Sequence, residues 1–593
     1  MTSLFRIHCT RTSTPAYPFG KWARGVVFCV IAGALCGWAL VLAVNASYPC
    51  QWPSEWDTLR DVGMAQSILD GRYPEDPILL GETLWYNPLT GAIIALAHVL
   101  SGLPLYRLSI VIGPYVNLLA PVVIVVLLAT LFGRVAALAG LCVLLFAKDP
   151  QLPFWVQASY SPWLLAPLYS LGLLFLTLTA YYQGLKTGSL RRHLLAGLLL
   201  GITFMAHTAP ALVAGGTMSL MLLIETSLSW RRKHEPDANT TLTTQLSRPL
   251  LQLPAYFLSL LAVAFIISLP YTWSILLNYR FHVYNPFPSL YAADYVSLEQ
   301  LPNRLREALN WRNALAIAGV GSLLARRRDA AARFALCWAA VVVLFAVQHY
   351  LWQALLARGV VWPSFVPGHH AAIHLSAMRA VLFAAGATAL GAAAISGAGA
   401  ALCAFFGRPP STAATTMMRY GGATAAAIGA GLALYSANPL SARVDFQAPD
   451  AALYHQFHEQ GIPMYQWILE NTAPDSVFLC EEEVSGMTVV MPAARKIVAP
   501  MLLYSNPYVS PEPLFDKQRI LFDAIEDGDR ATLCDEARHY PSLYLLTRED
   551  GVYARHRQVK RLFDKAHSAG GLVVWRMHPC QETSHTESNQ TTP

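Results

Sequence analysis

The feature that most constrains this chain is a series of apolar runs, each close to the length that crosses a bilayer. The first run covers residues 26–44 and follows a basic N-terminal segment, residues 1–24. A signal peptide has an apolar region of about 7–15 residues, whereas about 20 residues are needed to span hydrocarbon. We therefore predict an uncleaved anchor with a cytoplasmic N-terminus; the alternative is a cleaved signal that ends near Ala46.

Further apolar runs continue to about residue 440. Charged residues make up only 13% of the 593 residues, whereas soluble domains carry roughly 25%, so lipid is the main solvent of this chain. Together the runs predict a polytopic α-helical membrane module, residues 25–440, with about eleven crossings. The ten runs after the first are 108–132, 135–147, 162–183, 193–206, 210–229, 250–276, 313–325, 334–356, 372–405 and 420–437.

The orientation of the module follows from its basic loops, because loops that stay in the cytoplasm carry an excess of Lys and Arg. Alternation places every basic cluster on the cytoplasmic side, and an odd number of crossings sends the C-terminus outside. We expect a multi-pass protein, in a bacterial inner membrane, with an extracytoplasmic C-terminal domain. The basic clusters are Arg134, Lys186–Arg192, Arg231–Lys233, Arg326–Arg328 and Arg408.

Residues 441–580 have the composition of a water-soluble domain, and residues 581–593 that of a disordered tail. Short strand-like runs alternate with helical stretches, which predicts a small α/β domain. Four cysteines would face outside, where disulfides form, but the sequence does not select among their pairings. The expected strands are 476–480, 496–500, 543–546 and 571–575; the helices are 464–472 and 514–527; the cysteines are Cys50, Cys480, Cys534 and Cys580.

The first outer loop, residues 46–107, carries charge directly after the anchor. In its stretch EWDTLRDVGMAQSILD, residues 57–69 have the periodicity of an amphipathic helix with Asp57 and Asp61 on one boundary face. Such a helix would lie in the membrane interface, where an enzyme that acts on lipid-linked head groups needs polar residues. Asp57 has an alternative role as the N-cap of the helix. For Asp61 we favour a local ion pair with Arg60.

The helix is followed by G-x-Y-P, G-E and W-Y-N-P-L motifs from Gly71 onward and by an L-F-G-R turn at 131–134. Together with the Asp57 loop, these motifs resemble the GT-C superfamily. These membrane glycosyltransferases, such as protein O-mannosyltransferases and lipid A aminoarabinose transferases, use polyprenyl-phosphate sugars. The resemblance is best over residues 25–230. It implies that Asp57 is the catalytic base and that transfer inverts the anomeric centre. Several relatives have two adjacent acidic residues, whereas Trp56 precedes Asp57 here, so Glu55 is an alternative base.

Transfer from a phospholipid donor to a hydroxyl needs a carboxylate to take the acceptor proton and cationic or hydrogen-bonding groups to hold the departing phosphate. Polar residues on the same side are candidates for substrate binding, each with a structural alternative. The histidines can also be interfacial, Arg379 can pair internally within its apolar span, and the loop cations can be surface groups. The candidates are Arg60, Asp61, Arg72, Glu82, His207, His369, His370 and Arg379.

Two further expectations concern metal and acceptor. A divalent metal, bound by a histidine with a carboxylate, is possible by residue type, but no cofactor is certain. We expect Asp149, which precedes Pro150, to form a turn rather than to be a second acidic residue of the site. The loop 278–311, with Asp294, is placed to cover an acceptor.

Three functions fit the sequence. The first is a glycosyltransferase that moves a monosaccharide from a polyprenyl-phosphate donor to a hydroxyl on a lipid, glycan or protein at the outer face of the bilayer. The second is a transporter or flippase of lipid-linked sugars, which should show half-repeats and broken helices. The third is a non-catalytic membrane scaffold, in which the carboxylates would be dispensable. No feature indicates a nucleic-acid partner.

Overall fold

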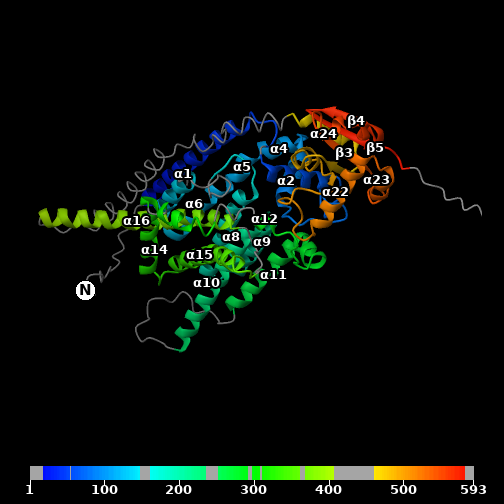
Figure 1. Ribbon diagram of the computed structural model, residues 1–593. Helices are drawn as coiled ribbons and strands as arrows, with labels where there is room; N and C mark the ends of the chain where they lie inside the picture. Colours follow the sequence, from blue (N-terminus) through cyan, green and yellow to red (C-terminus); the bar gives the residue numbers. More distant parts are fainter. Residues whose placement is uncertain are drawn as a thin grey trace, which may run out of the picture.

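The computed structural model describes residues 18–53, 55–146, 160–234, 252–290, 297–307, 310–360, 368–406 and 460–580. Figure 1 shows most helices gathered in one bundle, with a separate C-terminal domain, coloured orange to red, at one end of it. This domain lies beside helices α2 (Trp56–Leu69) and α4 (Leu105–Val111) of the first outer loop. The expected architecture, a helical membrane module followed by an α/β domain, is confirmed.

Six helical stretches of the described residues are long and apolar enough to cross a membrane. The chain is therefore an integral, multi-pass membrane protein. The last expected run, 420–437, lies outside the described residues, so the count of eleven crossings stays a prediction. The six stretches are Gly25–Ser47, Leu105–Phe132, Thr208–Arg231, Gln252–Asn278, Ala330–Leu356 and His369–Ala394.

The other expected runs within the described residues are also helical, although they are shorter or less apolar. The 135–147 run forms α7 (Arg134–Phe146). Three more of these helices are α8 (Ala166–Thr187), α9 (Leu190–Ala206) and α14 (Trp311–Ala325).

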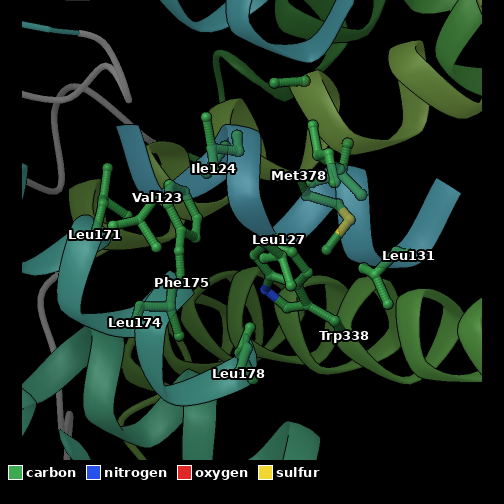
Figure 2. Packing of buried hydrophobic residues seen from close by; sticks show 14 of the residues in the cluster. Val123, Ile124, Leu127, Leu131, Leu171, Leu174, Phe175, Leu178, Trp338 and Met378 are labelled. Carbon is green, nitrogen blue, oxygen red and sulfur yellow. The ribbon is translucent and has the colours of Figure 1, made fainter. Parts of the chain in front are cut away.

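Large side chains from four helices meet at the centre of the bundle (Figure 2). Trp338 of α15 (Ala330–Leu356) is fully buried, and its ring centroid lies 5.9 Å from that of Phe175 on α8. Leu127 of α6 (Leu119–Phe132) and Met378 of α16 (His369–Phe406) complete this contact. Because lipid tails are as apolar as these side chains, such close packing is what holds membrane helices together.

A glycine pair brings α14 and α16 into backbone contact. A Cβ on Gly319 would overlap the carbonyl oxygen of Leu382, and one on Gly386 would overlap that of Leu315. Small residues at facing positions let membrane helices approach closely. This contact fixes α16, whose first residues are the candidate histidines His369 and His370.

The C-terminal domain contains one five-stranded sheet with the order β2-β1-β3-β5-β4. Strands β2, β1 and β3 are parallel, and β5 pairs antiparallel with both β3 and β4. The four strands expected from the sequence are confirmed, and so are the two helices α20 (Ile462–Asn471) and α22 (Glu512–Asp527). The strands are β1 (Val477–Cys480), β2 (Lys496–Ile497), β3 (Leu543–Arg548), β4 (Phe563–Ala569) and β5 (Leu572–Met577).

The strand β4 was not expected. It lies at the edge of the sheet and is largely exposed, so its sequence FDKAHSA has no apolar alternation to reveal it. Of the four cysteines expected outside, Cys534 and Cys580 form a disulfide, whereas the side chains of Cys50 and Cys480 are buried. The tail, residues 581–593, lies outside the described residues.

The C-terminal domain is docked on the first outer loop by backbone and charge contacts. The backbone N–H of Ile497, in the edge strand β2, donates to the carbonyl oxygen of Ile78 over 2.9 Å. The buried Arg495 lies 3.4 Å from Asp70 at the end of α2. These two contacts join the first outer loop to the C-terminal domain.

Candidate functional site

Helix α2 begins one residue before the expected position of its cap. Glu55 occupies the N-cap position, and Asp57 lies in the first turn. The interpretation of Asp57 as the N-cap is therefore wrong. The Glu55 side chain makes no capping hydrogen bond to the backbone of the helix.

The expected amphipathic pattern of α2 is also modified by tertiary packing. Residues on both sides of the helix are buried, because α2 lies between α3 (Leu89–Ser101) and the C-terminal domain. Gly63 faces the carbonyl oxygen of Met491 so closely that a Cβ would overlap it. The helix is thus an internal element between the bundle and the domain, with little polar surface left on its outer side.

Arg60 binds the two aspartates of α2 at once. Its Nη1 donates to Asp57 Oδ1 over 2.7 Å, and its Nη2 donates to Asp61 Oδ1 over 3.1 Å. The guanidinium carbon lies 3.5 Å from the ring centroid of Tyr86, a cation–π contact. The expected pair of Asp61 with Arg60 is confirmed. We call Asp57, Arg60, Asp61 and Tyr86 the α2 cluster.

The two aspartates of the α2 cluster differ in access to solvent. The side chain of Asp57 is 46% exposed, whereas that of Asp61 is 1% exposed. Burial raises the pKa of Asp61 to about 7, although Arg60 opposes this shift. Burial also raises the pKa of Glu55 to about 7, and the negative charge of Asp57 adds to it. Asp57 is the accessible carboxylate of the α2 cluster.

Histidines from two helix ends meet beside the α2 cluster. The His207 ring, at the end of α9, lies 4.5 Å from that of His370, which lies 4.0 Å from that of His369. The charge of Asp57 acts on His369, and that of Arg60 acts on His207. The structure thus brings together Asp57, Arg60, Asp61 and all three histidines proposed from the sequence.

The remaining candidates have other surroundings. Arg72 pairs with Glu75 at 2.7 Å, and Glu82 accepts a hydrogen bond from the Tyr279 hydroxyl over 3.0 Å. Arg379 is partly buried in α16, more than two helical turns beyond His370. Asp149 and Asp294 lie outside the described residues.

Two neighbours of this site were missed in the sequence. His374 is buried one helical turn after His370 on α16. The four-residue spacing, which puts both on one face of α16, is a signal that could have revealed it. Tyr504 of the C-terminal domain packs its ring 5.9 Å from that of Trp56. No local signal marks Tyr504, because the contact depends on the docking of the domain.

The residues described by the structure were also tested for a metal site. No group of three or more His, Cys, Asp or Glu side chains among them is arranged to hold a metal ion. The divalent metal that the sequence allowed therefore stays a prediction, and we derive no step through a metal.

No protein-family model and no curated protein matches the chain. Among solved structures, the chain is similar to apo ArnT from Cupriavidus metallidurans, with 12% identity over 95% of this chain and 100% of that one, and a TM-score of 0.48. It is similar to the same ArnT bound to undecaprenyl phosphate, with 12% identity, 94% and 99% coverage and a TM-score of 0.46. It is also similar to the Archaeoglobus fulgidus oligosaccharyltransferase in complex with Zn and sulfate, with 14% identity, 87% and 68% coverage and a TM-score of 0.46.

Proposed function

We propose that the chain is an integral-membrane glycosyltransferase of the GT-C type. It moves a monosaccharide from a polyprenyl-phosphate donor to a hydroxyl of a lipid, glycan or protein acceptor. The reaction takes place on the extracytoplasmic side, in a bacterial inner membrane. The proposal joins the sequence resemblance of the first outer loop to the polar site between the bundle and the C-terminal domain.

The observation that carries the proposal is the contrast between Asp57 and its neighbours. Asp57 is accessible, whereas Asp61 is buried, and Arg60 holds both carboxylates through Oδ1. One exposed carboxylate of fixed orientation, next to polar side chains and at the junction of two domains, is the arrangement that a general base needs.

In the proposed mechanism Asp57 takes the proton of the acceptor hydroxyl as its oxygen attacks the anomeric carbon. The bond from this carbon to the phosphate oxygen breaks, and the polyprenyl phosphate leaves with the bonding electron pair. A single displacement of this kind inverts the anomeric centre. Arg60 is occupied by two carboxylates, so its role is to orient Asp57.

The leaving phosphate needs other partners, since its negative charge grows as the bond breaks. His207, His369 and His370 lie beside Asp57, and Arg379 lies further along α16. We assign these four residues to the donor side. Arg72 and Glu82 belong to the part of the first outer loop that faces the C-terminal domain, and we assign them to the acceptor side.

The test is transfer of label by the purified full-length protein in lipid nanodiscs. The donors are undecaprenyl-phosphate esters of radiolabelled hexoses, and the acceptors are glycolipid and glycoprotein fractions of membranes. We expect transfer by the wild type and a loss of at least ~100-fold in Asp57→Asn. The matched control is Asp516→Asn, an exposed aspartate of α22, which should keep full activity.

Two outcomes would contradict the proposal. Equal transfer by Asp57→Asn and the wild type would remove Asp57 from the role of base. Absence of transfer from every donor, with label instead appearing in the opposite leaflet of the nanodisc lipids or of proteoliposomes, would favour a transporter of lipid-linked sugars.

A further inference from the structure

A short segment of the C-terminal domain, residues 501–508, crosses from the α2 cluster to the outer loop that follows α11 (Gln252–Trp273). We call it the 501–508 strap. At the α2 end, the rings of Tyr504 and Trp56 pack edge to face at 5.9 Å. Trp56 lies between Glu55 and Asp57 in the sequence, and the charges of both of these residues act on Tyr504, so Tyr504 lies near the proposed base.

The other end of the strap is fixed by the outer loop. Asn285 donates from Nδ2 to the carbonyl oxygen of Leu502 over 2.9 Å, and from its backbone N–H to that of Pro507 over 3.0 Å. Asn506, which is fully buried, donates to the Tyr279 hydroxyl over 2.8 Å. A segment with its backbone and side chains held in this way keeps Tyr504 in a fixed position.

The Tyr504 hydroxyl lies among the charges of the site. The charges of Asp57, Arg60 and Glu55 all act on it. Burial raises its pKa well above the usual value, so it keeps its proton and can donate a hydrogen bond. Within the described part of the chain no hydrogen-bond acceptor is paired with this hydroxyl. A half-buried donor without a partner, beside the base, is suited to a ligand atom.

The ligand on this side differs from the donor lipid. The histidines and Arg379, which we assign to the phosphate, belong to helices of the bundle, whereas the strap belongs to the C-terminal domain. A lipid-linked donor enters from the bilayer, so the domain side of Asp57 is left for the acceptor.

We propose that Tyr504 positions the acceptor: its hydroxyl donates a hydrogen bond to an oxygen of the acceptor while a neighbouring acceptor hydroxyl faces Asp57. This inference rests on the proposed glycosyltransferase function and adds the chemistry of the acceptor to it. The acceptor must carry a second oxygen near the reacting hydroxyl, as a sugar ring does.

The decisive variant is Tyr504→Phe, which keeps the ring on Trp56 and removes only the hydroxyl. In the transfer assay we expect the KM for the acceptor fraction to rise about tenfold, the usual effect of one lost hydrogen bond. The KM for the undecaprenyl-phosphate hexose and the unfolding midpoint should stay unchanged. Tyr508→Phe is the control, because Tyr508 belongs to the same strap but stacks on Tyr279 at 5.1 Å.

An unchanged acceptor KM in Tyr504→Phe, or equal changes in both KM values, would overturn the inference. If the wild type transfers no sugar at all, the proposed function fails, and a second measurement decides the position of Tyr504. This measurement is carbodiimide modification of Asp57, followed by mass spectrometry. Faster modification in Tyr504→Ala than in the wild type and Tyr508→Ala supports the placement of Tyr504 over Asp57, and equal rates reject it.

Discussion

Arg60 holds Asp57 through a 2.7 Å hydrogen bond from Nη1 to Oδ1, and the same guanidinium pairs with Asp61, one helical turn from Asp57. One cation is therefore shared by an exposed carboxylate and a buried one. Asp61 is buried, and Arg60 is its only cation among the described residues. Because a buried carboxylate without a cation is costly, this pair stays formed and Asp61 holds Arg60 in place. The exposed partner, Asp57, takes its orientation from this anchored group.

Arg60→Ala should destabilise the protein more than a surface substitution does. It leaves the buried Asp61 carboxylate without its cation, which costs about 3–5 kcal/mol, whereas Arg72→Ala breaks only an exposed pair worth about 1 kcal/mol or less. Thermal unfolding in detergent at pH 8 measures both. The double variant Arg60→Ala with Asp61→Asn should recover much of the stability and still transfer poorly. A double variant as unstable as Arg60→Ala would show that the unpaired charge is not the cause.

Glu55 predicts a pH dependence of stability. Its folded pKa is raised to about 7, so the folded protein binds this proton more tightly than the unfolded chain does. The stabilisation is therefore complete below the ordinary pKa of about 4.5 and is lost as the pH rises through 7. We expect the unfolding midpoint of the wild type to fall between pH 5 and 8 more steeply than that of Glu55→Gln. Parallel curves for the two proteins would refute this assignment.

The parts of the fold that the sequence revealed are those with a local signal. The strands at 477–480 and 543–548 are short apolar runs with turn residues on both sides, and the apolar runs of the bundle have the length that lipid requires. Strand β4 was not predicted from the sequence, because an exposed edge strand needs no apolar pattern. The alternative that Asp57 caps the helix is wrong, because the helix starts at Trp56 and Glu55 occupies the N-cap position.

The parts of the site that the sequence did not reveal depend on contacts between distant segments. Arg495 and Asp70 are 425 residues apart, yet they pair across the domain junction. The same docking places Tyr504 at Trp56. Residue type and topology suggested that Asp57 and the histidines share one side of the membrane. Residue type and topology did not reveal that the charge of Asp57 acts on His369, since their proximity depends on how α2 and α16 pack.

The disulfide predicts both the stability and the location of the C-terminal domain. Cys534 and Cys580 close a loop with a sequence separation of 46, so Cys534→Ser should cost about 2–4 kcal/mol of domain stability. Limited proteolysis of the full-length protein would report this loss, with Cys29→Ser in α1 as the control. Disulfides persist in oxidising compartments, so a membrane-impermeant maleimide should label these thiols in intact cells only after reduction. Labelling that requires permeabilised cells would place the domain in the cytoplasm.

Gly63→Ala should separate the C-terminal domain from the site without removing any polar group. The added methyl would overlap the carbonyl oxygen of Met491, so α2 and the domain must move apart. Overpacking of this kind costs about 1–3 kcal/mol, and the movement would shift Tyr504 away from Asp57. We expect faster proteolysis at the junction and a large loss of transfer. Gly37→Ala is the matched control, because a methyl on this glycine of α1 meets no atom within 4 Å, and alanine favours the helix. Full transfer by Gly63→Ala would mean that the docked domain is not needed for the reaction.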